Sequence, residues 1–243
     1  MVKGNIMKKF FACLAAVMTI GIGGLQHVDA TTIAFEGTGT LSGSPVDASA
    51  TFTTSANTIS ISLSNLIVNP TSVIQNISDL AFTLSTGQTV GTLTSSTGLE
   101  RTVASNGTYT DGAVVSTGWA VSSSGGGLLL NVLGTAIGPE HTILGAPGAG
   151  NVYSNANGSI AGNDPHNPFL AGAVTFNLNV AGVTAASTIT GVTFSFGTTE
   201  GNNVTGSCTR GCTPSVPEPA SLMLLGSGLA GLGLWGGKRR KNA

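Results

Sequence analysis

The sequence predicts an all-β domain, a single antiparallel β-sandwich or jelly-roll-like fold over residues 31–206. Apolar and hydroxylated residues alternate with a period of two in several runs, which is the pattern of a half-buried strand. Glycine and Asn-Gly dipeptides interrupt these runs at short intervals, as turns between antiparallel strands do. No comparable run before residue 220 shows the apolar spacing of an amphipathic helix.

Four runs are the clearest strand candidates, and the first of them shows the pattern. Ile59, Ile61 and Leu63 alternate with threonine and serine there, so one face is apolar and the other is hydroxylated. The four runs are residues 58–63, 80–84, 174–180 and 192–196. The turn residues expected between strands are Gly87, Gly91, Gly98, Asn106-Gly107 and Asn157-Gly158.

Two stretches of the predicted domain lack a strand pattern. Residues 122–127 are serine and glycine, which indicates a flexible, linker-like patch. Residues 138–168 contain four prolines among glycines and asparagines. A stretch of about 30 residues without strand pattern inside a domain predicts a functional or poorly ordered loop.

Charge is scarce and unevenly distributed. Only 8% of the 243 residues are charged, and seven of the nine basic residues lie near the two ends. Between residues 31 and 216 there are eight acids and two bases, Arg101 and Arg210, a balance of −6. Such a body has no cationic surface for phosphates, so nucleic-acid binding is not expected.

The first 30 residues have the organisation of a secretory signal peptide. Lys3, Lys8 and Lys9 precede an apolar run over residues 10–25, and residues 28–30 offer a cleavage site after Ala30. An uncleaved anchor is the alternative, although a run of about 16 residues is short for the roughly 20 that a span needs. We therefore expect export through signal peptidase and the secretion machinery.

A second apolar segment lies at residues 220–237 and is free of charge. As a helix it would be about 27 Å long, just enough to cross a hydrocarbon core. The basic tail, residues 238–243, follows with Lys238, Arg239, Arg240 and Lys241. With the body exported, the positive-inside rule leaves this tail in the cytoplasm, so a transient inner-membrane anchor is expected. Small residues in the segment favour either helix dimerisation or easy extraction by a membrane enzyme.

The segment before this span is rigid and extended. Val216, Pro217, Glu218 and Pro219 stand next to it, and two prolines around a glutamate can continue neither a helix nor a strand. Three parts follow one another here: this motif, a glycine-rich apolar helix and a basic tail. This order resembles the PEP-CTERM sorting signal of Gram-negative bacteria. The resemblance covers residues 216–243, and residues 207–215 would be a linker or stem.

This resemblance implies that an exosortase, a membrane transpeptidase, recognises residues 216–219 and cuts near them. Lys238 to Lys241 would be the retention tail. The body would then reach the cell-envelope surface or the medium. An ordinary tail-anchored protein with a proline-rich linker is the alternative.

Two cysteines follow the predicted domain and would face an oxidising compartment. Cys208 and Cys212 are four residues apart with Gly211 between them, a spacing that a turn can close into a disulfide. Free thiols and metal ligation remain alternatives, but no further ligand pair lies nearby. A disulfide here would clasp the stem.

Little in the body suggests chemistry. Asp164 and His166, with Glu140-His141 upstream, are the only neighbouring histidines and acids, and a solvated loop is the simpler interpretation. We expect no enzyme activity, no catalytic or metal site and no cofactor. The expected role is structural or adhesive in exopolysaccharide or biofilm. The alternative is a carbohydrate-binding module, whose aromatic platforms would be Tyr109, Trp119 and Tyr153.

Overall fold

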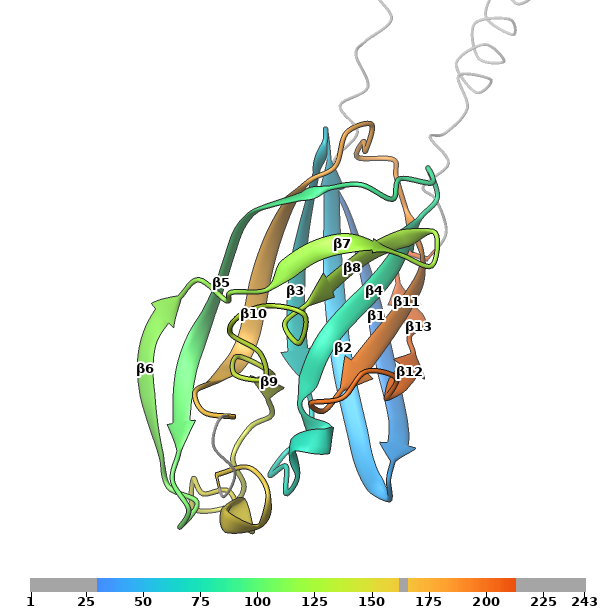
Figure 1. The fold of residues 1–243 in the computed structure, drawn as a ribbon. Helices are drawn as coiled ribbons and strands as arrows, with labels where there is room; N and C mark the ends of the chain where they lie inside the picture. Colours follow the sequence, from blue (N-terminus) through green and yellow to red (C-terminus); the bar gives the residue numbers. More distant parts are fainter. Residues whose placement is uncertain (1–29, 162–165, 213–243) are drawn as a thin grey trace, which may run out of the picture.

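The structure is a computed structural model, and it describes residues 30–161 and 166–212 (Figure 1). The described part is almost entirely β-structure, with two single-turn 3₁₀ helices, η1 and η2. The strands and turns are β1 Thr31–Leu41, β2 Ser44–Ser55, β3 Thr58–Asn65, η1 Val73–Gln75, β4 Ile77–Leu84, β5 Thr92–Val103, β6 Tyr109–Val115, β7 Ala120–Ser124, β8 Gly127–Asn131, β9 Ile143–Leu144, η2 Ala156–Gly158, β10 Phe169–Asn179, β11 Ile189–Phe196, β12 Asn203–Thr205 and β13 Ser207–Arg210.

The strands form two groups that β9 joins into one sheet. The first group has the order β13-β1-β2-β3-β10-β5-β6, and the second has the order β12-β11-β4-β8-β7. Strand β9 pairs in parallel with β10 and antiparallel with β4. All other strand pairs are antiparallel. The all-β prediction is confirmed. The fold differs from a sandwich of two separate sheets, because β9 pairs with one strand of each group.

The two groups face each other across one apolar core. Phe52 of β2 lies 5.2 Å from Phe82 of β4, measured between ring centroids, although these strands are not hydrogen-bonded neighbours. At Gly37 of β1, a Cβ would lie 2.5 Å from the Phe194 ring of β11, so only glycine allows this approach of the two groups. The apolar positions of β2 and β3 alternate with half-exposed threonines and serines, as a sheet with one buried face requires.

The four strand candidates correspond to β3, β4, β10 and β11, and only the third runs past its strand, by one residue beyond the end of β10 at Asn179. Residues 122–127, however, are not a flexible linker. They form the turn end of the β7–β8 hairpin, whose two-residue turn is Gly125-Gly126 with φ of 56° and 79°. Positive φ at both positions matches the right-handed twist of the strands, so the glycines here build a hairpin.

Two further positions differ from the sequence analysis. Gly98 is not a turn residue, because it lies inside β5, where a Cβ would come 3.0 Å from the Leu170 side chain. Residues 207–210, assigned to the stem, form strand β13 at the edge of the sheet. Both segments are in strand conformation because a neighbouring strand supplies backbone hydrogen bonds, and the local sequence does not reveal that neighbour.

Most of the described part of the long loop, residues 145–161, lies at one end of the molecule (Figure 1). The long loop contributes β9 and η2 and encloses a second, smaller apolar cluster with Tyr153, Ile160 and Phe169. The start of β1 and the end of β13 lie side by side, since Ala34 pairs with Arg210, at the opposite end.

Within residues 30–161 and 166–212, no helix is long and apolar enough to cross a membrane. The predicted signal peptide, except for Ala30, and the predicted membrane helix over residues 220–237 lie outside the described residues.

Candidate functional site

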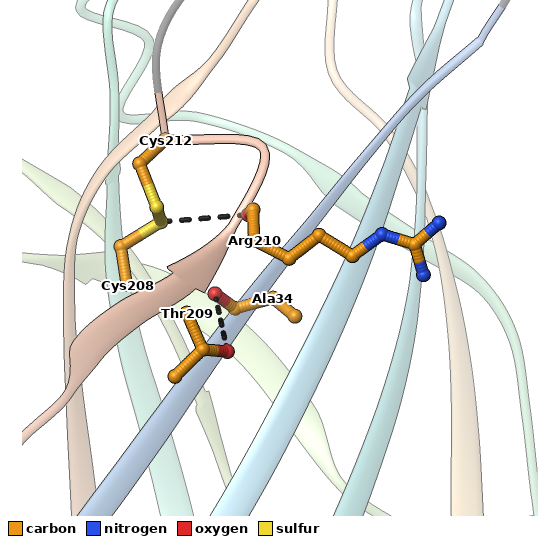
Figure 2. Close-up of a disulfide and its surroundings, with 5 residues drawn as sticks. All are labelled: Ala34, Cys208, Thr209, Arg210 and Cys212. Carbon is orange, nitrogen blue, oxygen red and sulfur yellow. Dashed lines mark hydrogen bonds between the residues drawn. A yellow bond between two sulfur atoms is a disulfide. The ribbon is translucent and has the colours of Figure 1, made fainter.

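The stem is held against the body by backbone pairing. Strand β13 runs antiparallel to the start of β1, with Phe35 opposite Cys208 and Ala34 opposite Arg210. The Thr209 hydroxyl donates to the Ala34 carbonyl oxygen at 3.3 Å (Figure 2). The polypeptide therefore leaves the domain from an ordered edge strand at the side of its first strand.

A disulfide joins Cys208 and Cys212 in the structure, with the two Cα atoms 5.9 Å apart (Figure 2). Gly211 between them has a φ of 70°, and a Cβ there would lie 2.4 Å from the Thr32 carbonyl oxygen. Glycine is required for this turn on both counts. The Cys208 Sγ lies 3.5 Å from the Arg210 carbonyl oxygen. We regard this as a close contact, because a disulfide sulfur has no hydrogen to donate.

The residues of the long loop that carry candidate chemistry do not all fall in the described part. Asp164 lies outside it. His166 is half-buried, and its Nδ1 atom is buried without a hydrogen-bond partner. Burial lowers the pKa of His166, because the charged imidazolium loses solvent. Glu140 is partly exposed. Within the described residues, no group of three or more histidines, cysteines, aspartates or glutamates is placed to hold a metal ion.

His141, by contrast, is a buried structural residue. Its Nδ1 lies 2.9 Å from the Thr117 carbonyl oxygen, and its Nε2 lies 3.0 Å from Glu100 Oε1. Its own carbonyl oxygen accepts from the Trp119 indole at 2.9 Å. Both ring nitrogens therefore have an oxygen partner, which fixes the orientation of the imidazole ring. These bonds attach the start of the long loop to β5 and to the segment before β7.

A second anchor of the long loop is Arg101 of β5, which the sequence analysis did not single out. Its guanidinium donates to both carboxylate oxygens of Asp111, at 2.6 and 2.9 Å, and to the Tyr153 hydroxyl at 3.0 Å. The Tyr153 hydroxyl in turn donates to the Gly145 carbonyl oxygen at 2.9 Å. Arg101 also lies over the Tyr109 ring, 3.9 Å from its centroid. One buried arginine thus connects β5, β6 and the loop.

The pKa values of this cluster follow from its geometry. Burial alone would lower the pKa of Arg101, but its hydrogen bonds to Asp111 and Tyr153 raise it overall. The hydrogen bond from Arg101 lowers the pKa of Asp111, and burial raises the pKa of Tyr153. The guanidinium and the Asp111 carboxylate are therefore both charged and paired in the folded protein.

Of the three aromatic residues expected as platforms of a carbohydrate-binding module, Trp119 and Tyr153 are buried and Tyr109 is half-buried. Trp119 is 4% exposed and packs on Phe176, with ring centroids 5.1 Å apart. Tyr153 is 1% exposed, and the half-buried Tyr109 meets it edge-on at 5.8 Å. Burial leaves the rings of Trp119 and Tyr153 without a free face on which a sugar could stack.

The segment that matches a known family lies outside the described residues. A family model described as the PEP-CTERM protein-sorting motif matches residues 215–241, which include Val216 to Pro219 and the tail from Lys238 to Lys241. No curated protein and no solved structure matches the chain. The motif implies export to the cell envelope with an exosortase as the processing partner. Over residues 215–241, the chain carries a PEP-CTERM protein-sorting motif.

Proposed function

We propose that the protein is an exported envelope protein that an exosortase cuts near residues 216–219, after a signal peptide has delivered it. In this proposal residues 220–237 hold the chain in the inner membrane, and Lys238 to Lys241 retain the tail in the cytoplasm. The observation that carries it is the match of the sorting motif to residues 215–241.

The body is proposed to be non-enzymatic and to serve as a structural or adhesive component of an extracellular polysaccharide layer. Two features fit that role. A disulfide fastens the stem, and its formation suits an oxidising compartment outside the cytoplasm. The body also has eight acids and two bases, a balance that keeps it off anionic surfaces.

The sorting step is tested by substitution in the motif. We expect Pro217→Ala combined with Glu218→Ala to leave the full-length chain in the membrane fraction, because the rigid recognition peptide is lost. Pro214→Ala is the matched control, since it removes a nearby proline outside the motif, and its processing should be normal. Pulse labelling followed by cell fractionation measures both. Normal processing of the double variant would contradict the proposal.

A further inference from the structure

The two ends of the described domain lie next to each other on neighbouring strands. Strand β1 begins at Thr31, directly after the predicted cleavage site at Ala30, and β13 ends at Arg210, which is opposite Ala34. The two strands are antiparallel, so the start of β1 and the end of β13 lie at the same end of the sheet. This is the arrangement of strands that a hairpin loop connects.

The turn after β13 keeps the stem beside the start of β1. A Cβ on Gly211 would lie 2.4 Å from the Thr32 carbonyl oxygen, and the disulfide of the stem closes the turn (Figure 2). Cys212 and Thr31 are each one residue away from this contact. Their Cα atoms therefore lie within about 14 Å of each other, since one residue step is about 3.8 Å. Cys212 is exposed, so the chain leaves the domain freely at this point.

The segment that the proposed cut leaves behind is long enough to bridge this distance. A cut near residues 216–219 leaves four to seven residues after Cys212. With the shortest of these segments, five residue steps would separate Cys212 from Thr31. Five steps span up to about 17 Å, which exceeds the separation of about 14 Å. The new C-terminus can therefore reach the N-terminus of its own chain.

The N-terminal amine is the only primary amine that the processed chain would have. The lysines of the sequence all lie in the two segments that processing removes, and they are Lys3, Lys8, Lys9, Lys238 and Lys241. The two basic residues between residues 31 and 219, Arg101 and Arg210, carry guanidinium groups that stay protonated. An α-amino group, by contrast, is partly unprotonated near neutral pH and can act as a nucleophile.

We propose that the exosortase joins the new C-terminus to the amine of Thr31 and so closes the exported chain into a ring. This rests on the proposed cut, with the exosortase acting as a transpeptidase. The enzyme's nucleophile takes the acyl group of the cut peptide bond, and the tail segment leaves as a protonated amine. The unprotonated Thr31 amine then attacks the acyl carbonyl carbon. The new peptide bond forms, and the amine's proton returns to the enzyme's nucleophile as it leaves.

Proximity favours the chain's own amine over the amine of a second copy. A short flexible tether gives an effective concentration on the order of millimolar. Neighbouring chain ends are common in protein domains. Here, in addition, backbone pairing of β13 with β1 and the disulfide hold the stem beside Thr32. The stem thus determines which amine takes the acyl group.

The test uses protein recovered from the envelope or the medium of cells with an active exosortase. We expect an intact mass that is lower by one water molecule than that of a linear chain with the same residues. Chymotrypsin identifies the new bond, because residues 197–219 contain no aromatic residue and no leucine. We expect one fragment that begins after Phe196, passes through the stem and continues into residues 31–35.

Labelling with an amine-reactive reagent provides an independent readout. The ring should take no label, whereas a linear chain should take one, at Thr31. Asn157→Lys is the matched control, because Asn157 is exposed and lies in η2 at the far end of the molecule. The ring of this variant should take one label, at the new lysine.

Removing the disulfide tests the role of the stem. Cys208→Ser combined with Cys212→Ser should lower the ratio of ring to linear product several-fold, because only β13 pairing then holds the stem. An unchanged ratio would overturn that role.

The outcomes separate this proposal from the proposed cut. A cut wild-type product that takes one label, whether linear or joined to another molecule, would overturn the ring and leave the cut intact. A chain that still ends at Ala243 would contradict the proposed cut, and the ring with it.

Discussion

Two regions of the domain are stabilised in different ways. Between the two strand groups lies a large apolar core that includes Phe52, Phe82 and Phe194. At the far end, the long loop covers a small apolar cluster and is tied down by Arg101 and His141, which are buried and hydrogen-bonded. Apolar contacts have no preferred direction and tolerate substitution by other apolar side chains. A buried polar side chain needs specific hydrogen-bond partners, so Arg101 and His141 each fix one arrangement of the loop. We therefore expect core substitutions to lower global stability and anchor substitutions to loosen the loop.

The largest effect is expected in the core. Phe52→Ala should lower the free energy of unfolding by about 3–5 kcal/mol, because the ring is fully buried between Phe35 and Phe82. Chemical denaturation measures this. Val90→Ala is the control, since Val90 is 76% exposed and should change stability by less than about 0.5 kcal/mol. A cost below about 1 kcal/mol for Phe52→Ala would mean that the two strand groups do not share one core.

The next effect is at the far end. Arg101→Ala should cost about 1.5–3 kcal/mol, because it removes charge-assisted hydrogen bonds to Asp111 and Tyr153. Amide hydrogen exchange should accelerate mainly over residues 145–161, with little change in β2 and β3. Arg101→Lys should rescue only part of this loss, since lysine has no planar fork. Arg210→Ala, at an exposed arginine, is the control. Uniform acceleration across the domain would contradict a local anchor.

The stability of the fold should depend on pH in opposite ways through two aspartates, because their pKa values are shifted in opposite directions. Arg101 lowers the pKa of Asp111 below its ordinary 3.8, so this pair stabilises the fold above pH 3.8, and the contribution is lost as pH falls through the lowered pKa. Burial raises the pKa of Asp79 above 3.8, so ionised Asp79 destabilises the fold as pH rises through that raised value. Relative to the wild type, Asp111→Asn should be less stable and Asp79→Asn at least as stable at neutral pH.

Both differences should shrink in acid, and denaturation curves at a series of pH values measure them. The Asp111 effect should stay within about 1 kcal/mol because the side chain is 38% exposed. The same sign for both variants at neutral pH would show that one assignment is wrong.

The smallest effect is expected at the β7–β8 turn. Gly125→Asn should change stability by only a few tenths of a kcal/mol, because asparagine tolerates positive φ and the site has open space. Gly125→Val should cost about 1–2 kcal/mol, because a β-branched residue resists that conformation. Thermal unfolding of both variants provides the measurement. Equal stability of the two would favour the flexible linker expected from sequence over the hairpin.

The sequence predicted the parts of the fold that depend on periodic burial. Ile59, Ile61 and Leu63 alternate with polar residues because β3 has one face in the core. The same alternation of apolar and polar residues occurs in β4, β10 and β11. Strands β7 and β13 show no such alternation, because their side chains are mostly exposed and only their backbone pairing defines them. A serine and glycine run therefore looked like a linker although its neighbours made it a hairpin.

The polar sites could be predicted even less. Arg101 had one signal, its rarity as one of two arginines in the body, but its partners Asp111 and Tyr153 are 10 and 52 residues away. The placement of Asp79 opposite Asn131 and Ser195 likewise depends on strand register, which a single sequence does not encode locally. The sorting motif was found because its three parts are contiguous in the chain.

The most direct test of the account is the intact mass of the protein recovered from the cell envelope or the medium of cells with an active exosortase. We expect a chain that starts after residue 30, ends near residues 216–219 and retains the Cys208–Cys212 disulfide. A recovered chain that still ends at Ala243 would contradict the account.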